Sequence, residues 1–244
     1  MLKSALKSAA LRLGYDVQRF EPASSHAAQL RAILATHRIN LILDVGANIG
    51  QFGRELRDHV GYDGRIVSFE PMRSAHEALT QVATGDALWE VAPRSALGAH
   101  SGRVTLNIAG NRYSASSSVL DMLPSHLEAA PESGYVGSEV VPLEPLDAVT
   151  PGYFRGDSRA FLKIDTQGYE SEVLRGAAET LGRVVGVQLE LSLVPLYEGQ
   201  RLMPELLEHL SRLGFELWGV APAFVDPRTG RMLQIDATLV RRGT

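Results

Sequence analysis

Short apolar runs alternate along the chain with segments in which apolar residues recur every three or four positions. The runs lie at residues 41–45, 65–69, 89–97, 160–165 and 185–191. Each is long enough for a buried strand, and most of the segments between them have the period of a helix that packs on a sheet. This alternation predicts an α/β fold with a doubly wound, mostly parallel sheet.

The C-terminal part of the chain predicts two more strands. Residues 215–220 and 233–240 are separated by a turn-rich sequence, so we expect a terminal antiparallel hairpin. One helix is predicted to end at Gly182, and another to run from Met203 to a stop at Gly214. The sheet would then have seven strands, with the parallel strands in the order 3-2-1-4-5 and the hairpin at the far edge.

Two segments fall outside this alternation. Residues 1–38 predict a helical preface to a domain at residues 39–244, and the first helix has one apolar face. We expect that helix to pack on the main domain or on a partner subunit, where it could form a dimer contact. Residues 110–144 are rich in Ser, Gly and Pro without a sustained period, and they predict an irregular insertion, either a lid or a solvated loop. The apolar face of the first helix comprises Leu2, Ala5, Leu6, Ala9, Ala10 and Leu13.

A glycine-spaced turn with the pattern D-x-G-x-N-x-G follows the first apolar run. It contains Asp44, Gly46, Asn48 and Gly50. A dinucleotide loop has the different pattern G-x-G-x-x-G, and Asp44 would repel its pyrophosphate. An ammonium or sulfonium group would instead be attracted, which points to S-adenosylmethionine as the cofactor. A structural role, with Asp44 bonding to nearby N–H groups and Asn48 capping a helix, stays open at this point.

Two further residues extend this predicted cofactor site. Glu70 follows the second apolar run, at the place where an acid binds the ribose hydroxyls in nucleotide-binding α/β folds. Ser95 lies near the end of the third run and would reach the adenine side if the first three strands are neighbours. The alternative for Ser95 is a strand-end serine that only satisfies backbone groups.

The turn at residues 44–50 and the Phe69-Glu70-Pro71 corner occur together with two later motifs. These are F-L-K-I-D-T-Q-G-Y-E at residues 161–170 and V-L-R-G-A at residues 173–177. From about residue 40 to the C-terminus, the chain resembles the FkbM-type methyltransferases. The resemblance implies a Rossmann-like class I fold, dependence on S-adenosylmethionine, and O-methylation of a hydroxyl on a sugar, a glycan or glycolipid, or a natural product.

Two acids lie at the ends of the fourth and fifth runs. In an open α/β sheet, ligands lie beyond the carboxyl ends of the strands, so Asp165 and Glu190 would face the acceptor half of the site. We expect Asp165 to take the proton of the acceptor hydroxyl, with Glu190 as the second candidate or as the partner of Lys163. The two carboxylates could also hold a divalent cation, which we do not expect.

Composition narrows the range of partners. The formal net charge of −4 gives no electrostatic reason to expect nucleic acid. No apolar run approaches the roughly 20 residues of a membrane span. The absence of cysteine excludes disulfides and a thiol nucleophile and fits a cytoplasmic location. The partner that the family resemblance implies is a small-molecule or glycan hydroxyl acceptor, and nothing in the composition opposes it.

Two other functions share the predicted fold. A nicotinamide-dependent oxidoreductase would need the dinucleotide glycine pattern, which the sequence lacks. A non-catalytic module that binds a partner protein would be expected to have lost the acids of the pocket, whereas Asp44, Glu70 and Asp165 are all present. The sequence therefore favours the enzyme.

Overall fold

The computed structural model describes the backbone of residues 2–244 and the side chains of residues 6–244. The strands of its main sheet are β1 (Leu41–Val45), β2 (Arg65–Phe69), β3 (Trp89–Val91), β7 (Ala160–Ile164), β8 (Val184–Ser192), β9 (Phe215–Val225) and β10 (Met232–Arg241). These seven strands have the order β3-β2-β1-β7-β8-β10-β9. The first five in this order pair in parallel, and β10 pairs antiparallel with both β8 and β9. The predicted sheet, strand order and terminal hairpin are confirmed.

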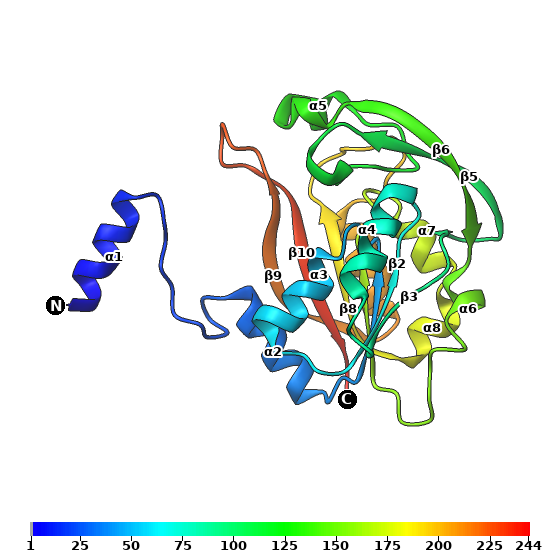
Figure 1. Ribbon diagram of the computed structural model, residues 1–244, viewed down its shortest axis with the longest axis horizontal. Coiled ribbons are helices and arrows are strands. Elements are labelled where there is room, and N and C mark those ends of the chain that lie inside the picture. Colours follow the sequence, from blue (N-terminus) through cyan, green and yellow to red (C-terminus); the bar gives the residue numbers. More distant parts are fainter. Residues whose placement is uncertain (1) are drawn as a thin grey trace.

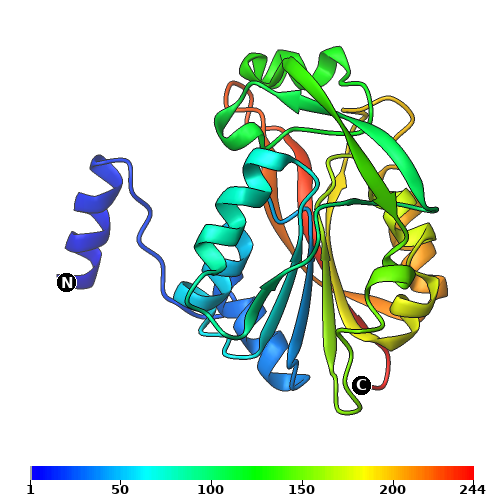
Figure 2. The same ribbon diagram turned by 45° about the vertical axis from the view of Figure 1, so that its right-hand side comes forward.

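Helices cover both faces of the main sheet (Figures 1 and 2). One layer contains α2 (His26–Thr36), α3 (Gln51–Glu55) with a π-helical turn at Leu56–Val60, and α4 (Arg73–Ala83). The other contains α6 (Leu146–Val149), α7 (Glu170–Arg175), α8 (Ala178–Arg183) and α9 (Met203–Arg212). Successive strand residues point to opposite faces, so Ile42 packs in the core under the first layer and Leu43 in the core under the second.

A smaller sheet forms a cap over the carboxyl ends of the parallel strands (Figure 1). It contains β4 (Ala96–Leu97), β6 (Tyr135–Glu144) and β5 (Gly102–Ala109), in that order, and α5 (Pro124–Ala129) lies between β5 and β6 in the chain. The prediction of an irregular segment is therefore wrong for residues 124–129 and 135–144. In β6 only Val141 and Leu143 are buried, so most of the strand lacks the apolar alternation that would have revealed it.

Two predicted elements are divided in the structure. The run at residues 89–97 gives β3 in the main sheet and β4 in the cap, because Pro93 between them has no N–H to donate to a strand ladder. The single helix predicted to end at Gly182 is instead α7 and α8, and Gly182 lies inside α8. The break falls at Gly176, where a Cβ would lie only 2.0 Å from the carbonyl oxygen of Gly98.

The first helix, α1 (Leu2–Arg12), stands apart from the sheet (Figure 1). Leu6, Leu11 and Leu13 are exposed, so the prediction that this helix packs on the main domain is wrong. Its contact with a partner subunit stays a prediction, and the side chains of Leu2 and Ala5 lie outside the described residues. None of the described helices is long and apolar enough to cross a membrane.

Candidate active site

A cavity of about 350 Å³ opens at the carboxyl ends of β1, β2, β7 and β8, under the cap. This is the position at which open α/β sheets bind ligands. Asp44 is fully buried beside the cavity, and Gly50 does not line the cavity but lies against Leu79 and Trp89. The other predicted site residues line the cavity: Gly46, Asn48, Glu70, Ser95, Asp165 and Glu190.

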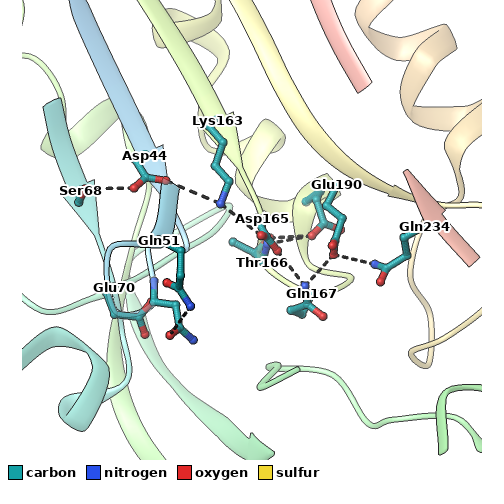
Figure 3. A network of polar contacts seen from close by, with 12 residues as sticks. Asp44, Gln51, Ser68, Glu70, Lys163, Asp165, Thr166, Gln167, Glu190 and Gln234 are labelled. Atoms are coloured by element: carbon teal, nitrogen blue, oxygen red, sulfur yellow. Dashed lines mark hydrogen bonds and ion pairs between the residues drawn. The ribbon is translucent and has the colours of Figure 1, made fainter. Parts of the chain in front are cut away.

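Asp44, Lys163 and Asp165 form a chain of charges in which Asp44 and Lys163 are buried and Asp165 is partly exposed (Figure 3). The Lys163 Nζ lies 3.7 Å from Asp44 Oδ1 and 3.2 Å from Asp165 Oδ2. Burial lowers the pKa of Lys163, but Asp165 and Asp44 outweigh burial and hold that pKa above its ordinary value. The expectation that Lys163 has an acidic partner is confirmed, but Glu190 is not among its ion pairs in the described part of the chain.

The Asp44 carboxylate is held from its other side as well. Ser68 Oγ donates to Asp44 Oδ2 at 3.1 Å, and Trp89 Nε1 donates to Ser68 Oγ at 3.0 Å. Burial raises the pKa of Asp44, while the Lys163 charge opposes the rise. Asp44 Oδ1 has no hydrogen-bond partner among the described residues, although Lys163 lies nearby. Asp44 is therefore held between Ser68 and Lys163 beside the cavity.

The glycine-spaced turn has the close approaches that its sequence predicts. Gly46 has a φ of +77°, and a Cβ there would lie 1.8 Å from the carbonyl oxygen of Asp165. Gly50 has a φ of +86° and packs against Leu79 and Trp89, so it supports the turn from the core side. Gly50, and not Asn48, occupies the helix N-cap position of α3, so the capping role considered for Asn48 is wrong.

Glu70 connects the first two strand ends. Its carboxylate accepts hydrogen bonds from the backbone N–H groups of Asn48 and Met72, both at 2.8 Å. Burial raises the pKa of Glu70 to about 7, although these two N–H groups oppose the rise. Ser95 is also buried and lines the cavity, and its Oγ donates to the carbonyl oxygen of Pro93 at 3.4 Å. The Ser95 hydroxyl thus satisfies a backbone carbonyl group and also lines the cavity wall.

Gln167 links the two predicted acceptor-side acids. Its Nε2 donates to Asp165 Oδ1 at 2.8 Å and to Glu190 Oε2 at 2.6 Å, and its Oε1 accepts from the Tyr197 hydroxyl at 2.9 Å. Gln167 has a φ of +53°, a backbone conformation that costs about 1–3 kcal/mol for a residue other than glycine. Sequence reasoning did not single out Gln167, although it lies inside the D-T-Q-G motif.

Glu190 has further polar neighbours on the terminal hairpin. Gln234 Nε2 donates to Glu190 Oε2 at 2.8 Å, and Asp236 of β10 lies opposite Glu190 in the strand register. Burial raises the pKa of Glu190 well above its usual range, and the charges of Asp165 and Asp236 add to the rise. Burial and then Asp165 also raise the pKa of Asp236, while Lys163, His26 and Gln188 oppose the rise.

Besides Gln167, three residues of this end of the cavity were missed by sequence reasoning: His26, Gln188 and Asp236. Asp236 lies in the terminal hairpin, and the register in which that hairpin pairs with β8 cannot be predicted from the sequence alone. His26 comes from the helical preface. Among the described residues, no group of three or more His, Asp and Glu side chains is arranged to hold a metal ion.

The sequence matches the model of the FkbM methyltransferase domain over residues 44–217. The chain belongs to the FkbM methyltransferase family. Its matched region contains all eight residues that the sequence predicted for the site, from Asp44 to Glu190. The family membership that the motifs indicated is thereby confirmed.

Several solved structures are similar to this chain. The FkbM methyltransferase from Methylobacillus flagellatus KT has 14% identity and a TM-score of 0.52, covering 82% of this chain and 43% of its own. TehB from Haemophilus influenzae has 8% identity and a TM-score of 0.46, covering 88% of this chain and 62% of its own. Magnesium protoporphyrin IX methyltransferase from Synechocystis PCC 6803, solved with bound S-adenosylmethionine, has 9% identity and a TM-score of 0.45. That match covers 88% of this chain and 77% of the other. No curated protein matches the chain.

The FkbM methyltransferase structure shares the α/β fold, and the present chain spans less than half of its length. The predicted class I methyltransferase fold is confirmed by this likeness together with the strand order. At this low identity the likeness supports the fold alone.

Proposed function

We propose that this FkbM-family methyltransferase uses S-adenosylmethionine to methylate a hydroxyl of a sugar, a glycan or glycolipid, or a natural product. The supporting observation is that one cavity joins two chemically different ends. Glu70 and the turn at residues 46–48 border one end, and Asp165 and Glu190 border the other. A cofactor and an acceptor can therefore meet in one enclosed space, as group transfer requires.

The residues of the first end fit S-adenosylmethionine. Each carboxylate oxygen of Glu70 accepts one backbone N–H, which leaves further lone pairs for ribose hydroxyls. Ser95 lines the same end, and Asp44 lies buried beside it with its charge compensated by the Lys163 ammonium. When bound, S-adenosylmethionine supplies a methyl group on a positively charged sulfur.

We assign the proton of the acceptor hydroxyl to Asp165. The Lys163 ammonium lies 3.2 Å from one oxygen of Asp165, and Gln167 donates to the other at 2.8 Å, so Asp165 is an oriented carboxylate at the cavity wall. Glu190 is the second candidate; its Oε2 accepts hydrogen bonds from both Gln167 and Gln234, and it has no ion-pair partner among the described residues. Asp165 would take the hydroxyl proton, and the bound cofactor would supply its methyl group to the acceptor oxygen and leave as S-adenosylhomocysteine.

Replacing Glu70 with glutamine tests the cofactor end. A glutamine amide keeps the size of the side chain but removes the charge and one acceptor oxygen, so charge-assisted hydrogen bonds to the ribose are lost. We expect Glu70→Gln to bind S-adenosylhomocysteine roughly tenfold more weakly in isothermal titration calorimetry. Wild-type protein should bind it at micromolar affinity and should not bind NAD.

A matched control is Asp157→Asn, which removes one exposed carboxylate from the loop before β7, at the opposite end of the strands. It should leave the affinity for S-adenosylhomocysteine unchanged. Equal affinity in wild type and Glu70→Gln would refute the assignment of the ribose end. Binding of NAD by the wild type would favour the oxidoreductase instead.

We also propose that the protein acts in the cytoplasm on a small-molecule or glycan acceptor and that α1 contacts a partner subunit. The zero cysteine count supports the location, and the exposed leucines of α1 support the contact.

We keep the division into a preface at residues 1–38 and a methyltransferase domain at residues 39–244 as a proposal. Ser114 and Ser117 of the cap line the cavity, which supports a lid role for residues 110–144.

A further inference from the structure

Asp165 and Glu190 lie at the end of the site away from Glu70 (Figure 3), and Asp236 lines the cavity with them. Among the described residues that line the cavity, Lys163 is the only Lys or Arg. Its ammonium is already shared between Asp44 and Asp165. Glu190 and Asp236 line the same end and have no ion-pair partner among the described residues. Their carboxylates are therefore without a matching positive charge.

An unpaired buried amide lies in the same wall. Gln188 is only 3% exposed, lines the cavity and precedes Glu190 by two residues, so both side chains point to the same face of β8. Its Oε1 has no hydrogen-bond partner in the described structure. Gln188 lies near enough to Asp236 to lower the pKa of that carboxyl group. A carboxylate only accepts hydrogen bonds, so the amide N–H group of Gln188 suits it better than the amide oxygen does. The unpaired oxygen adds to the negative potential of this end.

His26 completes this wall from another part of the chain. It is the first residue of α2, and its Nδ1 is buried without a hydrogen-bond partner in the described structure. His26 and Asp236 both lie outside residues 44–217, the region that matches the family model. Parts of the chain beyond the family motifs thus build this wall, as expected for residues that select an acceptor.

We propose that this end of the cavity binds a protonated amine, so that the acceptor is a hydroxylated amine such as an amino sugar. An ammonium group offers one positive charge, three N–H donors and no acceptor, which complements the carboxylates of Asp236 and Glu190. A neutral sugar would leave both carboxylates uncompensated in a partly buried site. With the ammonium at Asp236, a hydroxyl of the same molecule can face Asp165. This inference rests on the proposed function.

Paired probes test the proposal. Glucosamine and galactosamine are each compared with glucose, galactose and the N-acetylated amino sugar, using full-length protein saturated with S-adenosylhomocysteine. Affinities are measured by saturation-transfer NMR titration. We expect at least one amino sugar to bind about tenfold or more tightly than its neutral counterparts, because it alone brings a countercharge. Asp236→Asn should abolish this preference, and the control Asp157→Asn should keep it.

Binding of S-adenosylhomocysteine and the melting temperature are recorded for every variant, and Glu190→Gln replaces Asp236→Asn if that variant does not fold. Equal affinity within each set of sugars, or a preference that survives both substitutions, would overturn the amine site. The same holds if no amino sugar binds while S-adenosylhomocysteine does, or if Mg²⁺ alone binds at Asp236 and amines do not. If the wild type does not bind S-adenosylhomocysteine, the proposed function itself is overturned.

Discussion

Asp165→Asn should lower turnover by roughly a hundredfold or more and leave the affinity for S-adenosylhomocysteine nearly unchanged. Both oxygens of Asp165 are oriented, one by Lys163 at 3.2 Å and the other by Gln167 at 2.8 Å. An asparagine amide fills the same space but cannot take up the hydroxyl proton. The measurement is the steady-state rate of S-adenosylhomocysteine formation with any hydroxyl acceptor that the wild type uses.

Glu190→Gln is the comparison for this result. Glu190 shares Gln167 with Asp165, so its substitution changes the surroundings of the base without removing the base. We expect a smaller loss of turnover than in Asp165→Asn. We also expect a chelator to leave wild-type activity intact, since a base does not need a metal. Wild-type turnover in Asp165→Asn would rule out its role, and activity that a chelator abolishes and Mg²⁺ restores would assign Asp165 to a metal instead.

Lys163→Met should lower the free energy of unfolding by about 3–5 kcal/mol, the cost of leaving a buried charge without its partner. Lys163 compensates Asp44, whose side chain is 0% exposed, and its own side chain is only 8% exposed. Methionine keeps most of the side-chain volume, so the loss would come mainly from charge. Urea denaturation at neutral pH measures the change, provided that the dependence of the free energy on urea concentration is the same in both proteins.

Two controls separate charge compensation from general damage. Arg212→Met removes a cation from an ion pair with Glu208 whose side chains are 72% and 66% exposed, and it should cost less than about 1 kcal/mol. The double variant Asp44→Asn/Lys163→Met removes both buried charges and should recover part of the lost stability. A Lys163→Met variant as stable as Arg212→Met would contradict a compensating role. Equal stability of the single and double variants would show that Asp44 is not the charge involved.

The sequence predicts that the acids at the strand ends lie near one another, because the signals for this arrangement are local. Each acid follows a short apolar run, and parallel strands that are neighbours bring their carboxyl ends to one edge. The amino-acid sequence alone therefore places Asp44, Glu70 and Asp165 together. The glycine spacing carries similar local information, since Gly46 must approach the Asp165 carbonyl.

The acceptor end depends on pairings that a single sequence does not reveal. Asp236 reaches Glu190 only through the antiparallel register of β10 with β8. His26 arrives from a helix with no chemical motif, and the left-handed backbone of Gln167 is fixed by its surroundings. The cap strand β6 was missed because its pairing with β5, not its own apolar pattern, makes it a strand.

A crystal structure of the full chain with S-adenosylhomocysteine tests the central claim most directly. The account predicts electron density for the nucleoside in the cavity under the cap, with the ribose hydroxyls at the Glu70 carboxylate. The sulfur should face Asp165, and the space beside Glu190 and Asp236 should stay free for the acceptor. A ligand bound outside this cavity, or with its ribose at the Glu190 end, would contradict the account.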